Sequence, residues 1–184
     1  MSTASIFQVS ESMQAEGFEY ATLFKGSTPF GPFQVESGGY KPVGGLFFSK
    51  MKSLMDKDDE TCRVAPGWYS IIIRDEFRVH DYAMRDLMFA KFDPMELVES
   101  TDNLNRFDEN GAFRHDLNYF FSVPHWSRLT TCFSGIHVDP FLDANSDVFQ
   151  VASWDLDTVA IWNAHVLTSV RVSRNSGTPW TYEA

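Results

Sequence analysis

Residues 20–27 have the sequence YATLFKGS, an apolar run that ends in a lysine, a glycine and a serine. The apolar part, residues 20–24, has the length and composition of a short buried strand, and Gly26 with Ser27 interrupts regular structure. Glycine and proline recur as far as Pro42, which is typical of a shaped, exposed loop. We therefore predict a strand at residues 20–24 that leads into a long loop.

Further strands are predicted wherever β-branched and aromatic residues gather or apolar and polar residues alternate. These stretches are residues 45–48, 68–74, 132–138, 148–153, 158–162 and 166–173. Short helices are predicted at residues 50–55, with Ser49 as N-cap, and from Pro94 onward, with Asp93 as N-cap. Residues 101–111 are polar and are predicted to be an exposed insertion. Because strands dominate both ends and helices lie between them, the pattern favours the α+β class.

The length of 184 residues suits one domain with a substantial core, so we expect a single domain over residues 1–184. Residues 1–17 and 176–184 are expected to be loose termini. Neither GxGxxG nor GxxxxGK[ST] occurs, which argues against a Rossmann or P-loop nucleotide site.

The chain is acidic: 15 Lys and Arg against 25 Asp and Glu give a formal net charge of -10. A phosphate backbone would be repelled, so nonspecific nucleic-acid binding is not expected. The first residues lack the basic and apolar pattern of a secretory signal, and no stretch of about 18 apolar residues occurs. We expect no membrane association and a cytoplasmic protein, either in the cell that makes it or in a host cell that its maker infects.

The two cysteines, Cys62 and Cys132, lie far apart and form no CxxC pair. Their spacing indicates buried free thiols rather than a disulfide framework or a zinc site. His137 and Asp139 alternate along a predicted strand, and His80, His115 and His125 are scattered. Structural or surface roles are expected for these histidines, and no metal site is predicted.

Three stretches resemble, in order, the motifs of the ADP-ribosyltransferase superfamily, which includes poly(ADP-ribose) polymerases, diphtheria-type toxins and small phage-encoded members. They are residues 23–27 (LFKGS), 44–49 (GGLFFS) and 154–163 (WDLDTVAIWN). The resemblance leaves roughly residues 62–131 unaccounted for. It implies a split, mixed or antiparallel sheet with flanking helices, and a mono-ADP-ribosyltransferase that cleaves NAD and transfers ADP-ribose to a macromolecule, most readily a protein.

The resemblance also implies residue roles in NAD binding. Gly26 lets the backbone approach the nicotinamide carboxamide, and Ser27 completes that motif. Phe47 stacks on the nicotinamide ring, for which it needs only a π-face. Ser49 supports the site or the helix start. Lys25 stands where the family has His or Arg, and it offers the pyrophosphate a point charge without the fork of an arginine.

Asp157 occupies the position of the family's catalytic carboxylate. Breaking the nicotinamide–ribose bond develops positive charge on the sugar, which a carboxylate stabilises. The family usually has Glu here, and a misplacement of ~1 Å can cost on the order of 100-fold in rate. Asp155 lies two residues earlier, on the same face of an extended chain, and is the candidate base toward the acceptor. The alternative is that Asp155 and Asp157 are turn and strand-cap residues.

Two other functions stay open alongside transfer. Water can replace the acceptor, which makes the chain an NAD glycohydrolase. Alternatively, the departures from the family at Lys25 and Asp157 indicate a protein of the same fold that has lost catalytic activity. Such a protein binds NAD or a partner, or acts as an inhibitor. Neither the acceptor nor the oligomeric state is predicted.

Overall fold

The computed structural model describes residues 6–26, 33–35, 42–51, 85–99, 126–139 and 157–175. The strands predicted at 68–74 and 148–153, the insertion at 101–111 and the residues 52–55 lie outside these ranges. So do Ser27, Cys62, His80, His115, His125 and Asp155. Within the described ranges no helix is long and apolar enough to cross a membrane.

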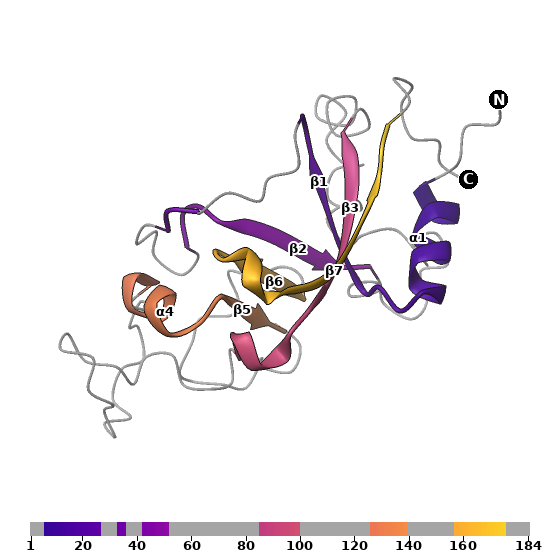
Figure 1. The fold of residues 1–184 in the computed structure, drawn as a ribbon. Helices are drawn as coiled ribbons and strands as arrows, with labels where there is room; N and C mark the ends of the chain where they lie inside the picture. The colour runs from indigo at the N-terminus through magenta and orange to yellow at the C-terminus, as the bar shows by residue number, and fades with distance from the viewer. Residues whose placement is uncertain are drawn as a thin grey trace. The chain divides into compact units, whose positions relative to one another are not determined.

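The described residues are mostly β, with seven strands and few short helices (Figure 1). The strands are β1 Tyr20–Phe24, β2 Leu46–Lys50, β3 Asp86–Phe92, β4 Leu97–Glu99, β5 Gly135–Val138, β6 Thr158–Ile161 and β7 Leu167–Ser173. The helices are α1 Ile6–Ala15, α4 Trp126–Cys132 and the 3-10 turns η2 Pro94–Glu96 and η6 Ala164–Val166. The strands are hydrogen-bonded in the order β4-β5-β6-β2-β1-β3-β7. The sheet is mixed, because β4 and β5 are parallel while β1 is antiparallel to β2 and β3.

Four predicted strands are confirmed to within two residues at either end. They are β1, which matches its predicted bounds, and β2, β6 and β7. Strand β3 was not predicted, although its sequence DLMFAKF is largely apolar and its middle residues are buried. The sheet is mixed, as predicted. The described helices are shorter and fewer than an α+β pattern suggests.

The prediction of a helix beginning at Lys50 after a Ser49 N-cap is wrong for the residues described. Ser49 and Lys50 continue β2 and pair with Ala21 and Tyr20 of β1. The Met51 N–H donates to the Glu19 carbonyl at 2.8 Å, and its side chain is buried. Strand pairing and burial thus outweigh the local preference of serine for a helix cap.

The predicted helix start at Asp93 is confirmed, but the helix is only three residues long. The Asp93 carboxylate accepts from the Met95 N–H at 2.9 Å, as an N-cap does. Leu97 and Val98 are buried in β4, which pairs with β5. The apolar pair gains more from the sheet than from an exposed helix, so the chain becomes extended after one turn.

Three further expectations are corrected. The strand predicted at residues 132–138 begins only at Gly135, because Cys132 ends α4. Cys132 is exposed and is therefore not a buried thiol. The N-terminal residues 1–17 are not loose throughout, since residues 6–15 form α1, whose Val9 and Met13 pack on a buried cluster. Apolar residues at helical spacing supply that contact.

The chain divides into two compact units, which are described separately. Unit 1 comprises Met1–Pro29, Phe48–Lys91 and Leu167–Ala184; unit 2 comprises Phe30–Phe47 and Phe92–Val166. The expectation of a single domain stays a prediction.

Unit 1 contains α1, β1, β7 and most of β2 and β3. Its core comprises Phe18, Ala21, Met51, Leu87 and Phe89. The C-terminal end of α1 is held by Lys91, whose ammonium donates to the Glu16 carbonyl at 2.6 Å and lies 4.7 Å from the Phe18 ring centroid. A cation at this end of a helix is favourable because it meets carbonyls that lack helical partners.

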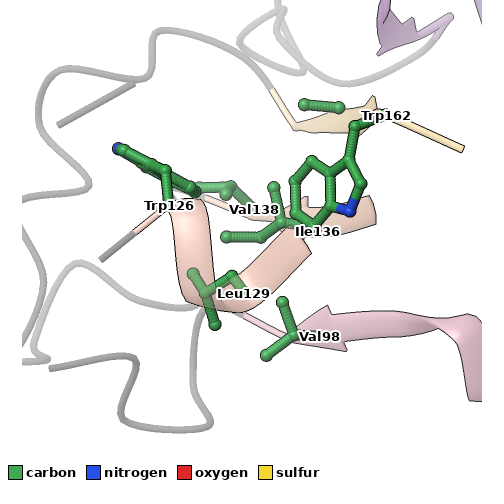
Figure 2. Packing of buried hydrophobic residues seen from close by; sticks show 7 residues of the cluster. Val98, Trp126, Leu129, Ile136, Val138 and Trp162 are labelled. Carbon is green, nitrogen blue, oxygen red and sulfur yellow. The ribbon is translucent and has the colours of Figure 1, made fainter. Parts of the chain in front are cut away.

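Unit 2 contains β4, β5, β6, α4, both 3-10 turns and the beginning of β2. Its core, here called the unit 2 core, lies on one side of these strands (Figure 2). It comprises Val98, Trp126, Leu129, Ile136, Val138, Ala160 and Trp162. Ile136 and Val138 alternate along β5, so the residue between them, His137, points to the opposite face.

Gly135 is the tightest described position between β4 and β6. A Cβ there would lie 2.7 Å from the Ala160 carbonyl oxygen and 2.8 Å from Leu97 Cδ2. We predict that Gly135→Ala lowers the free energy of unfolding by about 1–3 kcal/mol, because backbone atoms must move to admit the methyl group. Urea unfolding followed by tryptophan fluorescence measures the change. Ser12→Ala, on the exposed side of α1, is the control and is expected within about 0.5 kcal/mol of wild type. Equal stability of the two variants would contradict the packing described.

Candidate functional site

A histidine joined to two carboxylates is the most concentrated group of ionisable side chains among the described residues of unit 2. His137 Nδ1 lies 2.7 Å from Glu99 Oε2, and His137 Nε2 lies 3.0 Å from Asp157 Oδ1. The side chain of Asp157 is 3% exposed, that of His137 21% and that of Glu99 43%. The three side chains, here called the carboxylate–imidazole bridge, thus extend from the interior toward solvent.

Strand pairing brings these three residues together. In the parallel pair β4–β5, Glu99 is the partner of His137. In the antiparallel pair β5–β6, His137 is opposite Val159, which places Asp157 diagonally across from it. Neighbours of this kind lie within reach of a long or aromatic side chain. The bridge therefore lies on the face of β5 opposite to Ile136 and Val138.

The bridge raises the pKa of His137. Burial by itself lowers this pKa, because it disfavours the charged ring. The hydrogen bonds that the ring donates to Asp157 and Glu99 and the negative charges of these two residues outweigh burial, so the net pKa lies above the ordinary value of 6.5. The protonated ring donates from both nitrogens, one to each carboxylate.

Asp157, the predicted catalytic carboxylate, is buried directly before β6. Its bond to His137 gives it a specific partner across the strand pair, which the strand-cap alternative does not require. Asp155, the predicted acceptor base, lies outside the described residues. The structure thus describes one of the two predicted carboxylates.

Gly26 and Lys25, predicted to grip NAD, are exposed at the end of β1 in unit 1. Gly26 has φ +89°, and no described atom lies within 4 Å of a Cβ built on it. Its carbonyl accepts from Arg174 Nη1 at 3.1 Å, and the same nitrogen bonds Asp86 Oδ2 at 2.8 Å. Arg174 also lies over the Phe24 ring, so the end of the strand is fixed, while no described side chain covers the side of Gly26 where a Cβ would lie.

Phe47 and Ser49, the predicted residues of the second motif, differ in surroundings. Phe47 is partly buried and packs against the unit 2 core, on the face opposite to His137. Ser49 is buried within β2 in unit 1. Within unit 2 the structure therefore does not bring Phe47 to the carboxylate–imidazole bridge.

Glu99 was not predicted as a site residue, and His137 was predicted to have a structural or surface role. Glu99 falls in a stretch predicted to be helical, and its pairing with His137 spans 38 positions. The only local signal was the alternation of His137 with Asp139 on one face of a strand. No group of three His, Cys, Asp or Glu side chains suited to hold a metal ion occurs among the described residues.

We predict that the bridge makes stability depend on pH. A group whose pKa is raised on folding stabilises the native state fully below its unfolded pKa, and loses that contribution as pH rises through the folded pKa. His137→Gln should therefore cost about 1–3 kcal/mol near pH 6 and progressively less toward alkaline pH. Urea unfolding over this pH range measures the difference in free energy of unfolding between wild type and variant, with the exposed His165→Gln as control. A difference from wild type that does not vary with pH would contradict the charged bridge.

Comparison with known proteins gives no relative from which a role can be transferred. No family model, no curated protein and no solved structure matches the chain.

Proposed function

We propose that the protein is a mono-ADP-ribosyltransferase that takes NAD as its substrate and a protein as its acceptor. The bond between nicotinamide and ribose C1′ breaks with its electron pair going to nicotinamide. A nucleophilic group of the acceptor forms the new bond to C1′ and gives up its proton to a base, for which Asp155 is the candidate. Asp157 stabilises the cationic sugar between these two events.

The neighbourhood of the motifs within each unit carries this proposal. The three motifs that resemble the superfamily include residues of β1, β2 and β6. In unit 2, Gly45 approaches β6 so closely that a Cβ would lie 2.7 Å from the Ile161 carbonyl oxygen. In unit 1, Ser49 pairs with Ala21. Within unit 2 the second motif thus lies against the strand of the third, and within unit 1 it pairs with the strand of the first, which supports a shared function.

The conformation of Gly26 supports its proposed role toward nicotinamide. A carboxamide needs a backbone donor and acceptor that no side chain obscures. Gly26 has a positive φ, which a residue with a Cβ rarely adopts, and space where that Cβ would be. Its carbonyl bond to Arg174 leaves one of the two lone pairs of the oxygen for a ligand.

A protein that binds NAD or a partner without chemistry is the second candidate. The burial of Asp157 and the packing of Phe47 into the unit 2 core favour it, because both residues would need to meet substrate. Hydrolysis of NAD is the third outcome that an experiment distinguishes.

We predict that labelled NAD incubated with the protein and a cell lysate gives label on protein. Asp157→Asn keeps the size of the side chain but removes its charge, and is expected to lower the initial rate by about 100- to 1000-fold. Glu11→Gln, on the exposed side of α1, is the charge-matched control and should retain the wild-type rate. Circular dichroism checks that both variants fold.

The products separate the candidates. Free ADP-ribose without labelled protein indicates hydrolysis, and intact NAD that still binds indicates the non-catalytic protein. Unchanged transfer by Asp157→Asn would remove this residue from the reaction.

We further predict that Gly26→Ala weakens NAD binding at least about tenfold, because the methyl group enters the space assigned to the carboxamide. Gly17→Ala is the matched control, since Gly17 is also exposed and has φ +82°. Both substitutions should destabilise the protein by about 1–2 kcal/mol through backbone strain. Calorimetric titration with NAD separates the two effects, and equal affinities of the variants would contradict the role of Gly26.

A further inference from the structure

The geometry points to His137 as a positioning residue of the proposed reaction: its protonated ring, held by Glu99, fixes the orientation and charge of the Asp157 carboxylate. This inference rests on the proposed function for its consequence in catalysis. The bridge itself is a property of the ligand-free protein and can be tested without NAD.

The burial gradient along the bridge is the first argument. A buried carboxylate is costly unless a donor or a cation pairs with it. Asp157 is 3% exposed, and His137 Nε2 lies 3.0 Å from its Oδ1. An imidazolium in this place keeps the carboxylate ionised, which a developing sugar cation requires.

The use of both ring nitrogens is the second argument. Nδ1 bonds Glu99 at 2.7 Å while Nε2 bonds Asp157, so the ring plane is fixed from both sides. With both nitrogens donating to carboxylates, the ring has no lone pair with which to take a proton from an acceptor. The arrangement therefore suits holding Asp157 and not general-base catalysis by His137.

The charged groups around His137 are all acidic among the described residues of its own and adjoining strands. Glu99 comes from β4 and Asp157 from the start of β6. Asp139 follows β5 two residues after His137, on the same face by strand alternation. Glu99 and Asp157 favour the protonated ring, and no described Lys or Arg lies on β4, β5 or β6 to oppose them.

Deprotonation of His137 removes one of its two hydrogen bonds and the cation beside Asp157. Because its pKa is raised, the protonated form persists to a higher pH than in an ordinary histidine. The rate of transfer should therefore fall as pH rises through the His137 pKa, at a higher pH than an ordinary histidine would give.

Nuclear magnetic resonance tests the bridge directly. The nitrogen shifts of the His137 ring and the carboxyl carbon shift of Asp157 are followed against pH in the wild type and in Glu99→Gln. We expect two protonated ring nitrogens below a His137 pKa that exceeds 6.5, one shared titration, and a lower His137 pKa in Glu99→Gln. A His137 pKa at or below 6.5, or an Asp157 signal that ignores the His137 titration, would overturn the inference.

Initial rates of transfer against pH test the consequence. His137→Gln should lower kcat by roughly 10- to 100-fold with less than about threefold change in KM for NAD. Glu99→Gln should move the alkaline fall in rate to lower pH, a shift that loss of stability alone does not produce. His165→Gln is the matched control and should keep the wild-type profile.

The two experiments separate failure of the inference from failure of the proposed function. A wild-type protein that leaves NAD intact at every pH contradicts the function, and the spectra then decide the bridge alone. If the protein is active and its rate falls at the same alkaline pH in wild type and in Glu99→Gln, the positioning role is overturned and the proposed function stands.

Discussion

The buried carboxylate of Asp157, at the start of β6, needs hydrogen-bonding partners from the neighbouring strands. His137 reaches Asp157 across the strand pair and favours its charged form there, and His137 is itself held by Glu99. The interaction needs a parallel partner on one side of β5 and an antiparallel partner on the other. The three strands therefore serve as one support for a single carboxylate, whatever that carboxylate binds.

The alternation of β5 separates support from packing. Ile136 and Val138 point into the unit 2 core with Trp126 and Leu129 of α4, while His137 points to the other face. Gly135 lets β4 and β6 approach, since a side chain at that position would meet the Ala160 carbonyl. The unit 2 core, on one face of the strands, thus holds in place the strands that carry the carboxylate–imidazole bridge on the other face.

Local sequence patterns predicted strands well where the pattern continued through the whole element, as in Tyr20–Phe24 and the alternating Leu167–Ser173. They failed where a local helix signal was followed by residues that pair with a strand distant in the sequence. Asp93 and Pro94 correctly indicate a helical turn, but the pairing of β4 with β5 ends it. Asp157 was predicted as a site residue from the motif that contains it, whereas Glu99 becomes relevant only through a register that joins residues 38 positions apart.

The shorter side chain of Asp157 and its burial have a common physical consequence. A carboxylate one methylene shorter than glutamate has less freedom to turn, and its bond to His137 removes more. Such a group stabilises a transition state well if the sugar comes to it, and poorly if the carboxylate must move to the sugar. The same fixation in a protein without chemistry would stabilise β6 and nothing else. The difference lies in whether a ligand can reach a side chain that is 3% exposed, so access to Asp157, more than the acidity of the residue, distinguishes an enzyme from a binding protein here.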